Sequence, residues 1–388
     1  MEITQGARFD SMGLSPEIMR AIEKKGLTVS TPVQAGCIQP MMEWKDVIAK
    51  APTGTGKTFA FGIPIVEHID PGNDKIQAVI LAPTRELAIQ IAEELHALSE
   101  FKDGVRVVCA YGGQPIQKQI TVLKKRPQIV VATPGRLADH IKRRTIRVDA
   151  VQTVVLDEAD RMLDMGFIHD VTRILDQLKS RKNLGMFSAT ISREVMDIAW
   201  VYQRDAVEIT VRADEQNKPD ILQYRLDVAM NSKPEAMIKI LNQENYERVI
   251  AFCNTKGMVE RLTKMLQMNG IDADCIHGDI PQVKREQVME KFRSGKLRVF
   301  VATDVASRGI DVDDVDAVFN YDVPDENEYY VHRIGRTGRA KRRGTAYSFV
   351  SDYGAIVRLD EIAKFTKNSI ISVEFNADGK LVPIENKK

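Results

Sequence analysis

The stretch of sequence that decides the fold is residues 154–160, which read VVLDEAD. Three apolar residues lead directly into three carboxylates, Asp157, Glu158 and Asp160. An apolar run of this kind is typical of a strand buried on both faces of a parallel sheet. Such sheets bind ligands just beyond the carboxyl ends of their strands. The carboxylates are therefore expected at a ligand site, the alternative being a strand that ends in a solvated acidic turn.

The length and composition of the chain limit the classes of protein to consider. Its 388 residues exceed what one hydrophobic core usually supports, so two domains are expected. The formal net charge is only +1, so a nucleic-acid partner would have to be held by a local basic surface. No stretch approaches the roughly 18 apolar residues of a membrane span, and the N-terminus shows no secretory signal. The scattered cysteines fit a reducing compartment, and we expect a soluble, cytoplasmic protein without membrane contact.

Short apolar runs alternate with amphipathic helical patterns in both halves of the chain. The first half has runs at residues 47–49, 79–82, 105–109, 129–132, 154–156 and 184–187. The second half has runs at residues 249–252, 273–276, 299–302, 317–319 and 346–350. This alternation predicts an α/β fold with parallel sheets covered by helices on both faces.

A polar segment separates the two series of runs. Residues 211–220 (VRADEQNKPD) contain Pro219 and show no hydrophobic period, which is typical of a linker. We therefore expect a first domain at residues 1–210, a linker at 211–220, a second domain at 221–370 and a short tail at 371–388.

A phosphate-binding loop follows the first apolar run. Residues 51–58 read APTGTGKT, and glycines at these positions let backbone N–H groups wrap a phosphate at a helix N-terminus. Lys57 can reach the β- and γ-phosphates, and Thr58 can offer its hydroxyl to Mg²⁺. Asp157 then fits the group that holds Mg²⁺ through water, and Glu158 fits the general base for an attacking water. The alternative is a Gly-rich turn without a ligand.

The second half has no such loop but has clustered arginines. Residues 332–339 read HRIGRTGR, and the rigid fork of arginine suits the spread charge of a transferring phosphoryl group. A phosphate loop in one half and arginines in the other predict a single ATP site shared by both halves. A basic loop on a solvated face is the alternative.

With these motifs in this order, the chain resembles the DEAD-box RNA helicases of superfamily 2, as a minimal two-domain core. The resemblance covers essentially the whole chain and implies two tandem RecA-like domains joined by a short linker. Residues 26–34 (GLTVSTPVQ) are similar to the adenine-reading motif of that family, with Phe9 at the upstream aromatic position. The amide of Gln34 can donate to adenine N7 and accept from its N6 amino group, which favours ATP over GTP.

The resemblance also assigns roles to individual residues. The implied ATP-binding set comprises Phe9, Gln34, Thr53, Gly54, Thr55, Gly56, Lys57, Thr58 and, at the ribose, Asp304. The implied RNA contacts are Pro83, Thr84, Arg85, Gly113, Thr133, Gly135, Arg136, Thr255, Arg285 and Thr303. The implied links between hydrolysis and domain closure are Asp160, Ser188 and Thr190. The implied catalytic set comprises Lys57, Asp157, Glu158 and the arginine fingers Arg336 and Arg339.

The expected function is an RNA-stimulated ATPase that uses ATP and Mg²⁺ to separate short RNA duplexes locally. It would grip the RNA backbone without reading sequence, since few aromatic residues are present for base stacking. Protein partners in ribosome assembly or mRNA turnover are expected for such a core. Two alternatives stay open: an ATP-dependent RNA clamp that holds RNA without unwinding it, and a DNA translocase of the same superfamily.

Overall fold

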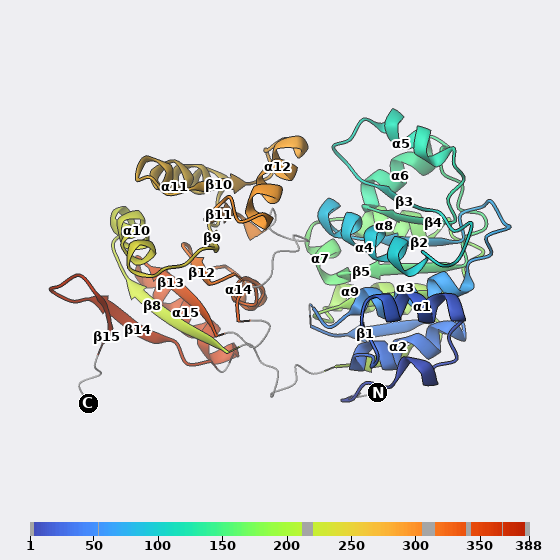
Figure 1. Ribbon diagram of the computed structural model, residues 1–388, viewed down its shortest axis with the longest axis horizontal. Helices are drawn as coiled ribbons and strands as arrows, with labels where there is room; N and C mark the ends of the chain where they lie inside the picture. Colours follow the sequence, from blue (N-terminus) through green and yellow to red (C-terminus); the bar gives the residue numbers. More distant parts are fainter. Residues whose placement is uncertain are drawn as a thin grey trace. The chain divides into compact units, whose positions relative to one another are not determined.

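The chain forms two compact units, residues Met1–Asn217 and Lys218–Lys388. The computed structural model describes residues 4–52, 54–211, 220–304, 315–338, 343–366 and 368–384. Each unit is built on a mainly parallel sheet with helices on its faces, which confirms the predicted fold class (Figure 1). Most of the predicted linker, residues 212–219, lies outside the described residues.

The sheet of the first unit has seven parallel strands in the order β3-β4-β2-β5-β6-β1-β7. The strands are β1 (Val47–Lys50), β2 (Ala78–Leu81), β3 (Val107–Ala110), β4 (Ile129–Ala132), β5 (Thr153–Asp157), β6 (Asn183–Ser188) and β7 (Val207–Thr210). The first six coincide with the predicted apolar runs. Strand β7 was not predicted, because only one of its four residues is fully buried and it forms no apolar run.

Helices cover both faces of this sheet (Figure 1). They are α1 (Pro16–Lys24), α2 (Pro32–Met42), α3 (Lys57–His68), α4 (Arg85–Leu98), α5 (Ile116–Leu123), α6 (Pro134–Lys142), α7 (Ala159–Asp164), α8 (Ile168–Leu175) and α9 (Arg193–Tyr202), preceded by the 3₁₀ turn η1 (Phe9–Ser11). Val155 packs into a core cluster with α1 to α4, whereas Val154 and Leu156 pack into a second cluster with α6 to α9. Strand β5 is thus buried on both faces, as its sequence predicted.

The sheet of the second unit has eight strands in the order β10-β11-β9-β12-β13-β8-β14-β15. The strands are β8 (Ile221–Asp227), β9 (Val249–Phe252), β10 (Ala273–Ile276), β11 (Val299–Ala302), β12 (Ala317–Asn320), β13 (Gly344–Val350), β14 (Ile371–Phe375) and β15 (Leu381–Pro383). Only the β14–β15 pair is antiparallel among the described strands. The helical elements are η3 (Met230–Ser232), α10 (Lys233–Gln243), α11 (Lys256–Met268), α12 (Gln282–Arg293), α14 (Asn327–Ile334) and α15 (Tyr353–Thr366).

The prediction of a tail at residues 371–388 is wrong for the part that forms β14 and β15. Strand β14 pairs in parallel with β8, and β15 pairs with β14, so both extend the second sheet. The sequence did not reveal these strands, or β8, because polar residues interrupt β8 and β14, and β15 has only three residues, none of them fully buried.

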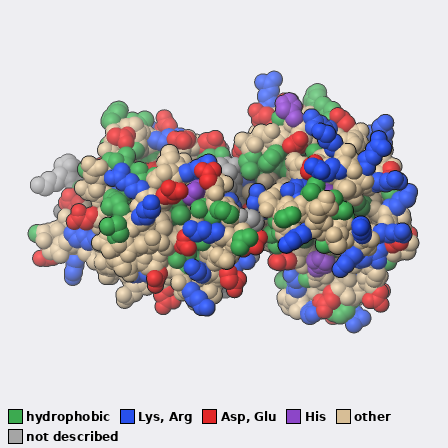
Figure 2. Space-filling view, turned by 90° about the horizontal axis from the view of Figure 1, so that it is seen from above, with side chains coloured by type: hydrophobic (Ala, Val, Ile, Leu, Met, Phe, Trp, Pro, Cys, Tyr) green, Lys and Arg blue, Asp and Glu red, His purple; other side chains and the backbone are tan. Residues whose placement is uncertain are grey.

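The surface of each unit is polar. Lys and Arg side chains and Asp and Glu side chains are both spread over the visible face (Figure 2), and the formal net charge of the whole chain is +1. Within the described ranges, no helix combines the length and the apolar composition needed to cross a bilayer.

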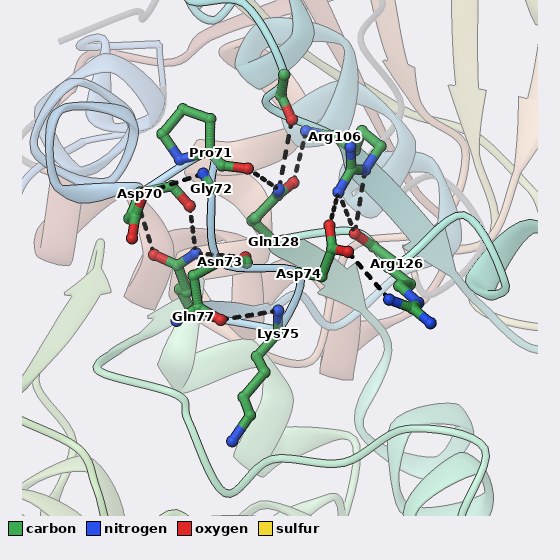
Figure 3. Close-up of polar contacts among 11 residues, drawn as sticks. Asp70, Pro71, Gly72, Asn73, Asp74, Lys75, Gln77, Arg106, Arg126 and Gln128 are labelled. Atoms are coloured by element: carbon green, nitrogen blue, oxygen red, sulfur yellow. Dashed lines mark hydrogen bonds and ion pairs between the residues drawn. The ribbon is translucent and has the colours of Figure 1, made fainter.

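A polar network fixes the loop between α3 and β2, where strands of the first sheet begin (Figure 3). The fully buried Gln128 accepts a hydrogen bond from the backbone N–H of Arg106 at 2.9 Å. Its Nε2 donates to the carbonyl oxygens of Pro71 and Gly104, each at 3.3 Å. Arg106 also pairs with Asp74 at 2.7 Å. These contacts set the starting points of β2, β3 and β4, and hence where their carboxyl ends lie.

We predict that Gln128→Ala lowers the free energy of unfolding by about 1–3 kcal/mol, because it leaves partly buried backbone groups without a partner. Urea denaturation of the whole chain measures the change. The same substitution at the exposed Gln177 should change the free energy of unfolding by less than about 0.5 kcal/mol. Equal effects at the two positions would contradict the assigned role of Gln128.

Candidate functional site

The predicted site residues of the first unit lie along one edge of its sheet, in an order set by the order of the strands. Because all seven strands are parallel, their carboxyl ends share that edge. The phosphate loop follows β1, the VVLDEAD carboxylates follow β5, and Ser188 ends β6. The predicted RNA contacts follow β2, β3 and β4, which are the neighbouring strands on the other side of β5. Strand β5 therefore separates the predicted nucleotide contacts from the predicted RNA contacts, and these two parts of the edge are called the nucleotide half and the RNA half.

The phosphate loop has the backbone shape that its glycines predict. Gly54 and Gly56 have φ angles of 80° and 84°, in the left-handed region that favours glycine. Helix α3 begins directly afterwards at Lys57, whose buried Nζ donates to the carbonyl oxygen of Ala51 at 3.0 Å. Thr58 lies next in the first turn of the helix, and Thr53 lies outside the described residues.

Gln34 contacts this loop directly. It forms a capping box with Thr31 at the start of α2, in which its Oε1 accepts from the Thr31 N–H at 2.9 Å. Its Nε2 donates to the carbonyl oxygen of Gly56 at 3.1 Å. A Cβ at residue 56 would come within 2.4 Å of that nitrogen, so the contact itself requires glycine. A primary amide carries two N–H donors and two acceptor lone pairs, so Gln34 can still read an adenine edge.

Phe9 is placed differently from the other predicted ATP contacts. Its side chain is 1% exposed and belongs to the core cluster of α1 to α4. The structure thus gives Phe9 a packing role in the first unit.

Asp157 is a buried carboxylate at the end of β5. Burial raises its pKa to about 7, opposed by the charge of Lys57 and reinforced by that of Glu158. Burial therefore disfavours the charged form of Asp157, and a divalent cation beside the carboxylate would stabilise that form.

Glu158 adopts a left-handed backbone conformation, with φ 50° and ψ 51°, at the N-terminus of α7. Its Oε2 accepts a hydrogen bond from Arg161 Nη1 at 2.8 Å, and the two side chains are 8% and 6% exposed. Arg161 was not among the predicted site residues. Its position one helical turn after an acid in a buried segment was the available signal.

Asp160 joins β5 to the segment after β6. Its Oδ2 accepts from both the backbone N–H and the hydroxyl of Thr190, at 2.9 and 2.7 Å. Its own backbone N–H donates to Ser188 Oγ at 3.1 Å. Burial raises the pKa of Asp160, but hydrogen bonds from Thr190 and Ser188 lower it by more, so the carboxylate stays charged. The three residues predicted to couple hydrolysis to closure are thus in contact.

The RNA half of the edge brings two predicted residues together. Arg85, at the start of α4, lies against Gly113, where an added Cβ would come within 2.3 Å of Arg85 Nη1. Gly113 has a φ angle of 87°, a backbone conformation that favours glycine, and a larger residue there would also displace the Arg85 guanidinium. Pro83, Thr84 and Thr133 are buried at the starts of helices, whereas Gly135 is exposed and Arg136 is half-buried.

In the second unit, Arg333 of α14 organises the carboxyl ends of the strands. It is 1% exposed and donates to both carboxylate oxygens of Asp304, at 2.7 and 2.6 Å. It also donates to Asn254 Oδ1 at 2.9 Å and to the carbonyl oxygen of Asp322 at 2.6 Å. Both oxygens of Asp304 are therefore already engaged, so a ribose hydroxyl would have to share them.

The other predicted residues of the second unit occupy separate positions. Thr255 caps α11, its Oγ1 accepting from the Met258 N–H at 3.2 Å. Thr303 directly follows β11, and Arg285 lies in the first turn of α12. Arg336 follows α14, and its carbonyl oxygen accepts from the Val315 N–H at 3.1 Å. Arg339 lies outside the described residues.

The described residues of the first unit fit ATP and Mg²⁺. The loop before α3 presents backbone N–H groups at a helix N-terminus with Lys57 beside them, as triphosphates require. Thr58 and the buried Asp157 supply a hydroxyl and a carboxylate, the hard oxygen ligands that Mg²⁺ prefers.

Two family models cover most of the chain. Residues 31–198 match the DEAD/DEAH box helicase domain, and residues 232–341 match the helicase conserved C-terminal domain. Among solved structures, S. cerevisiae Dbp5 bound to RNA and ADP BeF3 is similar with a TM-score of 0.83 and 29% identity, covering 94% of this chain and 95% of that one. Mss116p bound to ssRNA and AMP-PNP is similar with a TM-score of 0.83 and 30% identity, covering 97% and 83%. The two units are therefore the tandem RecA-like domains that were predicted.

Curated relatives are more similar in sequence. The DEAD-box ATP-dependent RNA helicase CshA of Geobacillus kaustophilus is 46% identical over 93% of this chain and 77% of its own length. CshA of Bacillus subtilis is 46% identical over 88% of this chain and 69% of its own length. CshA of Bacillus cereus is 44% identical, and this chain spans 65% of its length. The motifs, the fold and the relatives of this chain all agree, and the chain belongs to the DEAD-box ATP-dependent RNA helicases.

Proposed function

We propose that the protein is an RNA-stimulated ATPase that binds single-stranded RNA through its backbone and separates short duplexes. The observation that carries this proposal is the division of one sheet edge by β5 into a nucleotide half and an RNA half, with Asp160 and Thr190 joined beside β5. This arrangement supports a proposal in which ATP chemistry and RNA contacts lie on neighbouring strands.

In the proposed mechanism, the phosphate loop and Lys57 bind the triphosphate and orient the γ-phosphate. Thr58 and Asp157 hold Mg²⁺, which when bound neutralises charge on the phosphates. Glu158 takes the proton of the attacking water. Arg336 and Arg339 of the second domain contact the γ-phosphate, so that ATP favours a closed arrangement of the two domains.

Hydrolysis at the nucleotide half is proposed to be coupled to domain closure through the hydrogen-bonded residues Asp160, Ser188 and Thr190. Shifting two domains from mostly open to mostly closed requires the ligands to favour closure by about 5.5 kcal/mol. Opening base-pair steps costs about 1.4 kcal/mol each by the DNA value. Closure can thus offset the loss of only a few steps, so the enzyme should open short duplexes and leave long ones intact.

The proposed setting is the cytoplasm, with RNA as the partner and with protein partners in ribosome assembly or mRNA turnover. This chain spans about two thirds to three quarters of the length of these curated relatives.

The test is ATP hydrolysis by the whole chain with and without single-stranded RNA, beside unwinding of a short RNA duplex. We expect stimulation by RNA but not by DNA of the same sequence, together with unwinding. Stimulation without unwinding would favour an RNA clamp, and equal stimulation by DNA would favour a DNA translocase.

Glu158→Gln should lower kcat for ATP by about 10²–10⁴-fold, because the amide cannot accept the proton of water. Binding of ATP and RNA should persist, as measured by fluorescence titration of each ligand. The exposed Glu100→Gln variant serves as control. Unimpaired hydrolysis by Glu158→Gln would remove Glu158 as the base.

Gln34→Ala should reduce the preference for ATP over GTP by about 5-fold to 150-fold, since a bidentate base contact contributes about 1–3 kcal/mol of discrimination. The readout is the ratio of kcat/KM for the two nucleotides, because loss of the Gly56 contact lowers both values together. Gln39→Ala in the same helix should leave the ratio unchanged. If the ratio survives in Gln34→Ala, another residue reads adenine.

Arg336→Ala should lower kcat by about 10³-fold, the contribution typical of an arginine finger, with little change in ATP affinity. The exposed Arg343, which pairs with Asp220 at 3.5 Å, offers the control Arg343→Ala. Equal losses of kcat and affinity in Arg336→Ala would argue against a finger role.

A further inference from the structure

Arg136, one of the proposed RNA contacts, is held by neighbouring side chains and backbone. It lies in the first turn of α6, where its Nη1 donates to the carbonyl oxygen of Gln114 at 3.1 Å. The same nitrogen donates to Gln119 Oε1 of α5 at 3.0 Å. A long side chain with a rotatable stem is thereby restricted to one direction.

Gln119 is fixed in turn from two other sides. Its side chain is buried, and its Nε2 donates to the carbonyl oxygen of Tyr111 at 2.8 Å, which fixes the orientation of the amide. Its Oε1 lies 2.9 Å from His140 Nε2. Because that oxygen can only accept, Nε2 of His140 carries a proton and donates it.

His140 is fully buried and lies one helical turn after Arg136 on α6. Its Nδ1 is 2.8 Å from Thr145 Oγ1, so both ring nitrogens have partners. Burial lowers the pKa of His140, and the charge of Arg136 lowers it further, opposed by Asp139. The ring is therefore neutral near pH 7 and supplies one oriented donor to Gln119.

We propose that His140 is a positioning residue for RNA binding, which acts through Gln119 to hold the Arg136 guanidinium toward the RNA backbone. The inference rests on the proposed function, in which Arg136 contacts RNA. Its physical basis is pre-organisation: an arginine already fixed loses less conformational freedom when it binds. Among the described residues, the side chain of His140 forms hydrogen bonds with Gln119 and Thr145 and with none on the nucleotide half of the edge. ATP binding should therefore not depend on His140.

The measurement is the RNA concentration that half-maximally stimulates ATP hydrolysis by the whole chain. His140→Leu keeps an apolar side chain of similar size but removes the donor, and should raise this concentration about threefold to tenfold, the range expected for freeing one long side chain. The KM for ATP should not change. His140→Gln, which restores an amide donor, should return the value toward that of the parent. The exposed His96→Leu serves as the matched control.

A double-mutant cycle separates a positioning role from a merely structural one. Arg136→Ala should raise the half-stimulating RNA concentration, and adding His140→Leu to it should change nothing more. Additive effects, or no effect of His140→Leu alone, would overturn the inference. No effect of Arg136→Ala would overturn the RNA role of Arg136 in the proposed function itself.

A second variant interrupts the same contacts one residue closer to Arg136. Gln119→Met removes the acceptor for both Arg136 and His140 at nearly constant volume. It should reproduce the weakened RNA stimulation, again without addition to Arg136→Ala. If His140→Leu unfolds at the assay temperature, this variant decides the question, and unchanged RNA stimulation in Gln119→Met would overturn the inference.

Discussion

The constraint on which the first domain depends is the parallel pairing of β5 between β2 and β6. Val154 and Val155 pair with residues of both neighbours, so their backbone groups are satisfied on either side while their side chains fill two separate cores. A strand held in this way cannot shift its register without moving apolar side chains out of both cores. Asp157 and Glu158 therefore leave the sheet at one defined point. The phosphate loop and the RNA-half loops lie on opposite sides of that point.

A few polar contacts turn this arrangement into a connected site. Gln34 ties the start of α2 to the phosphate loop at Gly56, and Asp160 ties β5 to Thr190. Each contact is buried or half-buried, where an unpaired group would be costly, so each is strongly maintained. On the RNA half, Gln119 connects Arg136 and His140 by hydrogen bonds to both side chains. In the second domain, Arg333 connects Asn254 and Asp304 by donating hydrogen bonds to both side chains.

Most of the fold was predictable because its central strands are continuous apolar runs. Such runs need no knowledge of their neighbours to be recognised, and β5 is the clearest of them. Strands β8, β14 and β15 escaped prediction, since β8 and β14 are interrupted by polar residues and β15 has only three residues, none of them fully buried. The site residues were recognisable where function requires a particular residue type, as at Gly56 and Lys57. Arg161 and His140 escaped because a buried charged or polar side chain is recognised only when its partner is known.

The candidate RNA contacts came from the family resemblance, whereas the sequence by itself determined the fold class, the candidate phosphate loop and the carboxylates at the end of β5. These follow from local properties: hydrophobic period, glycine in loops, and carboxylates directly after a strand. Only the tertiary structure decided that β5 lies between the two halves, that Phe9 is packed in a core and that Asp304 is engaged by Arg333. Strand order and buried partnerships depend on contacts between residues far apart in the chain. No local pattern encodes them.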